Sequence, residues 1–162
     1  MSGRVDPARE GGSGHPHPRG GPHVGLASAS VTDDPTPETI VHSILTRLDG
    51  GTRRRDLIGV LDLFVDDAAL FGSDAGEFAV GRADVRRFLT GLFAEPVTYG
   101  WTWDHPVAGR HGEVVWFVAD GQAVLEGEGA PPPVPYRLSG VLLQVNGGWR
   151  FALFNGAQPV TA

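Results

Sequence analysis

After residue 36, apolar residues recur at helical spacing. The residues of this stripe are Ile40, Ile44, Leu45 and Leu48. They fall on one face of a helix, because positions three and four apart lie above one another. Thr36 suits the N-cap, Pro37 suits the first helical position, and a Gly50-Gly51 pair follows the stripe. The pattern predicts a helix from Pro37 to about residue 50, ended by the glycines.

Two further helices and two short strands are predicted next. Apolar positions at helical spacing predict helices over residues 52–64 and 82–93. Between them, residues 68–71 form a short apolar run and residues 77–79 form a second one. The intervening Gly72-Ser73-Asp74-Ala75-Gly76 has the composition of a turn, so we expect a hairpin.

The second half of the chain shows a period of two, clearest where Tyr99, Trp101 and Trp103 alternate with Gly100, Thr102 and Asp104. This period of two predicts four longer strands, over residues 99–107, 113–126, 135–145 and 149–155. Asn146-Gly147-Gly148 is a strong hairpin signal, and the proline-rich run at 127–133 predicts a loop. Helices followed by an antiparallel meander indicate an α+β class.

Residues 1–34 differ in composition from the rest of the chain. They are rich in Gly, Pro, Ser and His and show no apolar periodicity. Such a segment buries too little surface to offset its ordering entropy, so we expect a disordered tail at 1–34 and a folded domain at 35–162. The histidines of this tail, His15, His17 and His23, lack a further ligand nearby, which favours a solvated tail over a metal site.

Charge and composition exclude several classes of function. The formal net charge is −6, which disfavours nonspecific nucleic-acid binding. There is no cysteine, so disulfides, thiolate metal sites and cysteine nucleophiles are excluded. No apolar run approaches the roughly 18 residues of a membrane span, and no secretory h-region is evident. We therefore expect a cytoplasmic protein that binds neither nucleic acid nor membrane.

Four segments of the chain carry a family resemblance. They are Phe64 to Leu89 (FVDDAALFGSDAGEFAVGRADVRRFL), Val115-Trp116-Phe117, the run from Arg137 to Leu142, and Trp149-Arg150-Phe151. Their order resembles the SnoaL-like, polyketide cyclase-like branch of the nuclear transport factor 2-like superfamily. The resemblance implies a cone-shaped fold in which three helices pack on a curved, mixed and mostly antiparallel sheet around one pocket. It names no reaction, since members of this superfamily include enzymes and binding proteins.

The sequence departs from its relatives at positions that carry their chemistry. Many SnoaL-like proteins end the last strand with His-x-Ser-x-Pro, where this chain reads Asn155-Gly156-Ala157-Gln158-Pro159. Alignment with the similar ketosteroid isomerases places their general-base Asp on Gly72 and their oxyanion-hole Tyr near Ile44. Ordinary ketosteroid isomerase chemistry is therefore not expected.

Three charged residues are the catalytic candidates. Asp74 and Glu77 lie in the loop that closes the wide end of this fold, and Arg137 lies on a central strand. A carboxylate held there is a candidate general base, and Arg137 is a candidate ligand for a substrate oxyanion. In the simpler interpretation both acids are solvated loop residues, and Arg137 pairs with one of them to hold the loop.

Aromatic and small polar side chains are the candidate binding residues. These are Phe71, Phe78, Trp101, Trp103, Trp116, Ser139 and Asn155. Aromatic residues at every second position of a strand suit a ligand cavity. They suit a core or a dimer interface equally well.

The resemblance and the candidate residues together favour a protein with a small-molecule pocket. The hypothesis is a cofactor-independent isomerase, cyclase, dehydratase or hydrolase that acts by general acid/base chemistry on a small hydrophobic or aromatic molecule. The alternative is a non-catalytic binding or accessory dimer module with the same pocket. No metal or cofactor is predicted, and a homodimer is expected, because relatives often pair through the outer face of the sheet and two strands carry apolar residues on both faces.

Overall fold

Three helices and seven strands form residues 34–160, the part of the chain that this computed structural model describes. The helices are α1 (Pro37–Arg53), α2 (Leu57–Leu61) and α3 (Arg82–Ala94). The strands are β1 (Phe64–Phe71), β2 (Phe78–Val80), β3 (Thr98–Trp103), β4 (Val107–His111), β5 (Val114–Glu126), β6 (Val134–Val145) and β7 (Gly148–Ala157). Apart from Asp34, the expected tail lies outside the described residues.

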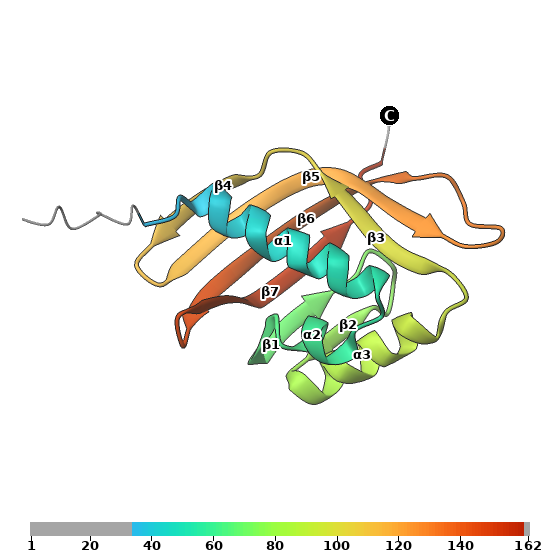
Figure 1. Ribbon diagram of the computed structural model, residues 1–162, viewed down its shortest axis with the longest axis horizontal. Coiled ribbons are helices and arrows are strands. Elements are labelled where there is room, and N and C mark those ends of the chain that lie inside the picture. Colours follow the sequence, from blue (N-terminus) through green and yellow to red (C-terminus); the bar gives the residue numbers. More distant parts are fainter. Residues whose placement is uncertain (1–33, 161–162) are drawn as a thin grey trace, which may run out of the picture. The chain divides into compact units, whose positions relative to one another are not determined.

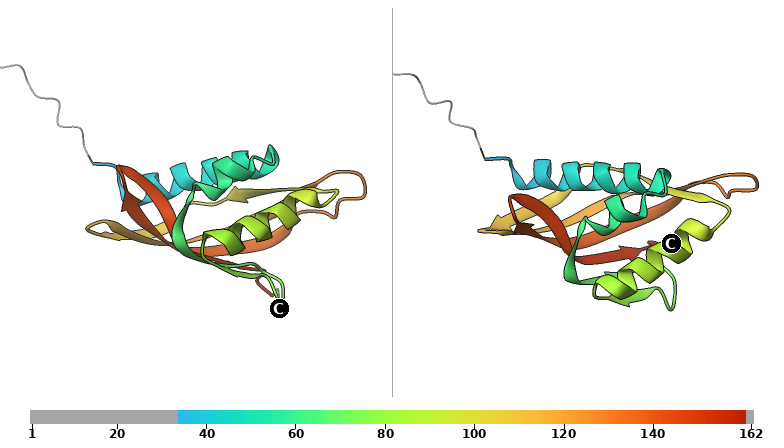
Figure 2. Two further views of the ribbon diagram at one scale, coloured as in Figure 1. Left: turned by 90° about the horizontal axis from the view of Figure 1, so that it is seen from below. Right: turned by 60° about the horizontal axis from the view of Figure 1, so that its bottom comes forward.

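The strands form one mixed sheet that curves around the helices (Figures 1 and 2). Its order is β2-β1-β7-β6-β5-β3, and β4 pairs with β5 next to β3. Only the pairing of β1 with β7 is parallel among the described strands. The predicted α+β class, with helices on a mixed and mostly antiparallel sheet, is confirmed.

Helix α1 begins as its sequence predicts. The Thr36 side chain accepts a hydrogen bond from the backbone N–H of Thr39, and the residues of the predicted stripe are all buried. The helix does not end at the glycine pair. A Cβ built on Gly51 would lie 2.6 Å from Val60 Cγ2, so this glycine allows α2 to pack closely against α1.

The second predicted helix is mostly wrong. Within residues 52–64, Thr52 and Arg53 are the end of α1, only Leu57–Leu61 forms a separate helix, and Phe64 already belongs to β1. Arg55, with a φ of 55°, interrupts the helical backbone between α1 and α2. The Asp56 side chain then caps α2, because its carboxylate accepts a hydrogen bond from the backbone N–H of Gly59. The predicted strand at 99–107 is also divided, because the chain leaves the ladder between Trp103 and Val107 and resumes as β4.

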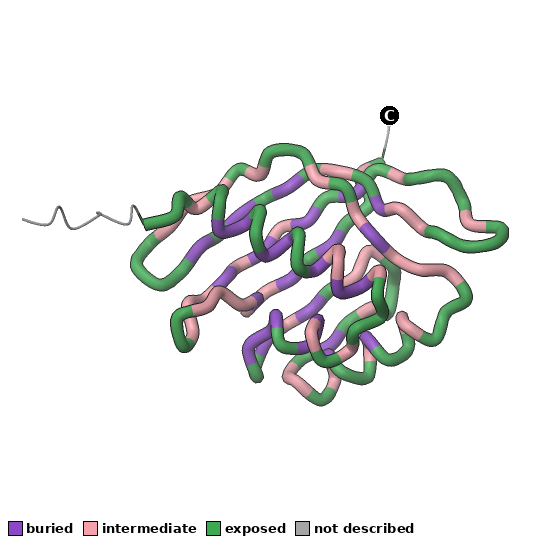
Figure 3. Tube along the Cα trace, in the orientation of Figure 1, coloured by how far each residue is buried: buried purple, intermediate pink, exposed green. Residues whose placement is uncertain are grey.

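The core lies between the helices and the concave face of the sheet (Figure 3). Strand β5 shows the alternation most clearly: Val115, Phe117 and Ala119 are buried, whereas Val114 and Trp116 are exposed. Buried aromatic rings continue the core into β7, where Phe151 packs 5.2 Å from Phe64, measured between ring centroids. Burial of apolar area at this interface drives the helices onto the sheet.

A β-bulge changes which residues of β7 face the core. Val141 pairs with Leu153 and Leu142 pairs with Phe151, so Ala152 is an extra residue in β7. Phe151 and Phe154 are therefore both buried although they are three positions apart. An extra residue of this kind reverses the alternation on its far side.

The Asp49 carboxylate joins α1 to β3. It accepts the backbone N–H of Trp101 at 2.7 Å and the Arg53 Nε–H at 2.9 Å. Arg53 also pairs with Glu126 at the end of β5, and hydrogen bonding to Asp49 raises the pKa of its guanidinium. The helix is thus fixed across two strands by one carboxylate and one guanidinium.

Asp49→Ala should lower the free energy of unfolding by about 1.5–3 kcal/mol, the range for hydrogen bonds to a charged group. The substitution leaves the Trp101 N–H without its acceptor and Arg53 with one acid fewer. Urea unfolding would measure the change. Asp66→Ala is the control, since this exposed acid makes only a 3.7 Å pair with Arg82, and it should change stability by less than about 0.5 kcal/mol. Equal effects of the two substitutions would contradict the proposed role of Asp49.

Candidate functional site

A cavity of about 270 Å³ lies between the helices and the concave face of the sheet. Most of its wall is apolar and comes from α1, α3, β1, β3, β5, β6 and β7. The apolar and aromatic wall includes Leu48, Phe64, Leu70, Phe88, Leu89, Leu92, Trp101, Ala123, Leu125, Val134 and Phe154. Its polar groups are few, as is usual for small-molecule sites, and several of them come from the segments that follow β1 and β7.

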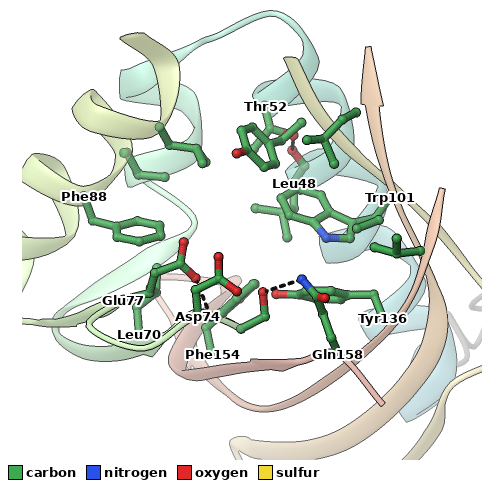
Figure 4. A pocket seen from close by; sticks show the side chains of 18 of the residues that line it. Leu48, Thr52, Leu70, Asp74, Glu77, Phe88, Trp101, Tyr136, Phe154 and Gln158 are labelled. Carbon is green, nitrogen blue, oxygen red and sulfur yellow. Dashed lines mark hydrogen bonds between the residues drawn. The ribbon is translucent and has the colours of Figure 1, made fainter. Parts of the chain in front are cut away.

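The loop from β1 to β2 supplies two carboxylates to this cavity. Asp74 and Glu77 both line it, and Figure 4 shows them pointing into the space between Phe88 and Tyr136. Asp74 is exposed, whereas Glu77 is half-buried. The Glu77 carboxylate also accepts the backbone N–H of Asp74 at 3.0 Å, which holds the two acids in one tight turn. The predicted position of both acids at the cavity agrees with the structure.

Gly72 makes room for the Glu77 side chain. A Cβ built on Gly72 would lie 1.9 Å from Glu77 Oε2 and 2.6 Å from Glu77 Cβ. The Glu77 carboxyl group therefore occupies the space that a longer side chain at position 72 would fill. By the alignment above, position 72 is the place of the general-base Asp in ketosteroid isomerases.

Tyr136 is the buried polar group opposite the loop. Its side chain is 6% exposed and lines the cavity, and its hydroxyl makes no hydrogen bond within residues 34–160. A Cβ built on Gly156 would lie 1.8 Å from the Tyr136 Oη, so this glycine is needed for the hydroxyl position. Burial raises the pKa of Tyr136, and the charges of Glu77 and Asp74 raise it further. The phenol therefore stays protonated and is a hydrogen-bond donor.

Three of the predicted aromatic residues have different surroundings. Trp101 lines the cavity. Trp103 lies behind it, stacked on the Trp101 ring at 6.3 Å and in edge contact with Tyr136 at 6.1 Å. Both indole N–H groups are buried without an acceptor within the described residues. Trp116 is 44% exposed on the opposite face of the sheet, over Gly109, so its predicted place in the cavity wall is corrected.

Arg137 is not at the mouth of the cavity. Its guanidinium pairs with Asp120 on the neighbouring strand, with Nε 2.6 Å from Oδ1, and the side chain is 52% exposed. The hydrogen bond from Arg137 lowers the pKa of the Asp120 carboxyl. Because side chains alternate along β6, the buried neighbours Tyr136 and Leu138 face inward and Arg137 faces outward. The predicted grouping of Arg137 with the two acids is therefore corrected.

Ser139 and Asn155 share the outer face with Arg137. They are opposite one another on β6 and β7, and Asn155 Nδ2 donates to Ser139 Oγ at 3.1 Å. Neither lines the cavity. In β7 the bulge places Phe154 inward and Asn155 outward, so the predicted binding role of both polar residues is not supported by their positions.

Phe71 and Phe78 form an exposed pair on the β1–β2 hairpin. Their ring centroids are 5.0 Å apart, and the two residues are partners in the strand register. The residues that alternate with them, Leu70 and Ala79, are buried instead. Neither phenylalanine lines the cavity, and this placement corrects the predicted one.

Sequence reasoning missed Tyr136, together with Tyr99, Phe88, Phe154 and Gln158. The signal for Tyr136 was present: it precedes Leu138 and Leu142 in the inward phase of β6. Gln158 follows β7 and donates from Nε2 to Ser73 Oγ at 3.3 Å, which links the end of β7 to the acidic loop.

Within residues 34–160 there is no group of three or more His, Cys, Asp or Glu side chains placed to hold a metal ion, and no helix long and apolar enough to cross a membrane.

Solved structures with this fold have low sequence identity to the chain. One is "a putative aromatic ring hydroxylase" from Novosphingobium aromaticivorans, at 19% identity and a TM-score of 0.68, covering 77% of this chain and 90% of that one. A nuclear transport factor 2-like protein of unknown function from Pseudomonas putida has 13% identity and a TM-score of 0.66, covering 76% and 87%. ActVI-ORFA from Streptomyces coelicolor has 15% identity and a TM-score of 0.62, covering 73% and 93%. These likenesses show the fold.

The sequence itself shows the family. A comparison with curated proteins found no match. The SnoaL-like domain, in contrast, matches residues 41–160, which include every strand of the sheet and all three helices except the first turn of α1. This match places the chain in the SnoaL-like domain family.

Proposed function

We propose that the cavity binds a small, mostly apolar carbonyl compound and that Glu77 moves a proton on it. The observation that carries this proposal is that the half-buried Glu77 carboxylate and the Tyr136 phenol line the same cavity from opposite sides. A carboxylate is a suitable general base, and a phenol that stays protonated is a suitable donor to an oxyanion. The family supports the coarser part of the proposal, a small-molecule binding domain.

The proposed reaction is proton transfer next to a carbonyl group. Glu77 takes a proton from the carbon beside the carbonyl; the electron pair of that C–H bond forms a C=C bond, and the π pair of the carbonyl moves to its oxygen. Tyr136 donates a hydrogen bond to the resulting enolate oxygen. When Glu77 returns the proton to another carbon of a conjugated substrate, the result is an isomerisation without a cofactor. When a hydroxyl group lies on the carbon next to the one that lost its proton, the enolate re-forms the carbonyl, the C–O bond breaks, and the protonated Glu77 gives its proton to the leaving oxygen, so water is lost.

Glu77 is the better base of the two acids. It is half-buried, whereas Asp74 is exposed, and water is excluded more fully from the deeper group. Its carboxylate also fills the space above Gly72, so it replaces the side chain that this position lacks. Asp74 lies nearer to solvent and suits a role in binding.

Solvent-hydrogen exchange would test the proton transfer. The probe is 2-tetralone, a bicyclic ketone with acidic hydrogens beside its carbonyl, followed by NMR in D₂O. The protein should accelerate exchange, Glu77→Gln should reduce the acceleration by about 100-fold or more, and Tyr136→Phe by about 100-fold. Asp67→Asn is the control, because this exposed acid on β1 does not line the cavity.

The alternative, a binding protein without catalysis, gives a different result in the same experiment. There 2-tetralone would raise the melting temperature of the protein, yet its hydrogens would exchange no faster than in buffer. Full activity of the Glu77→Gln variant would instead show that another group is the base.

Alkaline pH should destabilise the fold through Tyr136. Its pKa is raised in the folded state, so above the ordinary tyrosine pKa of about 10 the unfolded chain loses this proton first. Stability is therefore complete below about pH 10 and falls as the pH rises beyond it. Urea unfolding at about pH 8 and about pH 11 should show a smaller fall for Tyr136→Phe than for the wild type. Tyr99→Phe is the comparison: the pKa of Tyr99 is also raised, but this residue is less buried than Tyr136, so its substitution should reduce the fall less. Equal falls for the wild type and Tyr136→Phe would contradict the buried, protonated phenol.

We also propose that the outer face of the sheet forms a homodimer interface. Val114, Trp116 and Val118 are exposed side by side on β5, and partly exposed Val141 and Leu143 lie opposite them on β6. A contiguous apolar surface of this kind is typical of a protein interface.

Light scattering at micromolar concentration should give twice the chain mass for the wild type and the mass of a single chain for the Trp116→Glu variant. Phe78→Glu, at an exposed aromatic of the β1–β2 hairpin, should remain dimeric, and a monomeric wild type would end the idea.

A further inference from the structure

The charged side chains of the cavity wall are all acidic. Among the residues that line it, Asp74 and Glu77 are the ionisable acids, and no Arg, Lys or His contributes. Arginines around the cavity are engaged elsewhere: Arg53 pairs with Asp49 and Glu126, and Arg55 donates to the carbonyls of Phe93, Glu95 and Val97. Arg87, which lines an adjoining pocket together with Glu77, pairs with Asp84. The two carboxylates are therefore not neutralised by a basic side chain of the wall.

The negative charge reaches across the cavity to its far wall. Burial is the main cause of the raised pKa of Tyr136, but Glu77 and Asp74 contribute to it as well. The pKa of Tyr99 is also raised, first by burial and then by Glu95, Glu77 and Asp74. Both phenols line the cavity, so a ligand between them and the loop experiences the same field.

Aromatic rings surround the space in front of the carboxylates. Phe88, Tyr99, Trp101, Tyr136 and Phe154 all belong to the wall. The face of an aromatic ring carries negative electrostatic potential and attracts cations, an effect that grows when the cation is desolvated. Carboxylates and aromatic faces thus favour the same kind of ligand, one with a positive charge.

The Tyr136 hydroxyl adds a second requirement that is independent of charge. The residue is 6% exposed, and its hydroxyl makes no hydrogen bond within the described residues and lies in the cavity wall. A phenol O–H that faces the cavity can donate a hydrogen bond to an oxygen acceptor of a bound molecule. The complementary ligand carries an oxygen as well as a positive charge.

We propose that the cavity is selective for organic cations: an amine whose ammonium group lies beside Asp74 and Glu77, with an apolar body against the aromatic wall and an oxygen toward Tyr136. Carboxylates and phosphates are disfavoured, because they would face two like charges. This inference rests on the proposed function of the cavity as a ligand site, and it narrows the class of ligand.

A set of three probes with one ring system tests the selectivity. The probes are 2-(aminomethyl)naphthalene, 2-(hydroxymethyl)naphthalene and 2-naphthoate, which are cationic, neutral and anionic at pH 7. Isothermal titration should give the tightest binding for the amine and the weakest for the carboxylate, with about tenfold or more between them. Added salt should reduce the difference, because it screens exposed charges.

Two double variants locate the origin of the selectivity. Asp74→Asn with Glu77→Gln should bring the three affinities within about threefold of one another, since both charges of the wall are removed. Asp67→Asn with Asp104→Asn removes the same charge from exposed positions outside the wall and should preserve the order of affinities. Circular dichroism and thermal melting of each variant establish that it is folded.

The possible outcomes separate this inference from the proposed function. Equal binding of amine and carboxylate would overturn cation selectivity while leaving a small-molecule site in place. Selectivity that survives in the Asp74→Asn, Glu77→Gln variant would also overturn it, because the charge would then arise elsewhere. If none of the three probes bound, the ligand-site proposal itself would be contradicted together with this inference.

Discussion

The parallel pairing of β1 with β7 is the constraint on which the site depends. In a parallel pair the two strands end at the same edge of the sheet. Phe71 at the end of β1 is the partner of Asn155 near the end of β7, so the acidic loop that follows β1 emerges beside the last residues of β7. Tyr136 reaches the same place from β6, since its hydroxyl lies over Gly156. An antiparallel arrangement of β1 would direct the loop to the far end of the sheet.

The cavity exists because the helices are held at a fixed position over this sheet. Asp49 binds both the backbone of β3 and Arg53, and Arg55 donates to the carbonyl of Phe93 in the last turn of α3 and to those of Glu95 and Val97 before β3. These polar contacts lie around the cavity rather than inside it. The apolar wall is therefore free to accept a ligand, while the distance between α1, α3 and the sheet is fixed by charge-assisted hydrogen bonds.

Sequence patterns predicted the elements and the acidic loop but not the face of each central strand. Nearly every residue from Val114 to Ala119 is apolar, so alternation in β5 gives no clear phase, and β6 has the same property around Val141. Arg137 was expected at the cavity because it lies on a central strand. Its partner Asp120 is on the adjacent strand, and this pairing depends on the strand register, which the sequence pattern does not contain. The bulge in β7 is likewise a property of the folded β6–β7 pair. Because of it, Phe154 lines the cavity and Asn155 faces outward. Asp74, Glu77 and Trp101 were correctly expected at the cavity. Their position follows from the order of the elements in the fold, which the family resemblance predicts.

Gly72 shows how the backbone limits what chemistry this cavity can hold. An ideal Cβ at that position would overlap the Glu77 carboxylate, which lies only 1.9 Å away. A side chain at residue 72, directly after β1, and the Glu77 side chain in its present position therefore compete for one volume. A substitution at residue 72 would displace the Glu77 side chain, so the cavity holds an acidic group at only one of these two positions at a time.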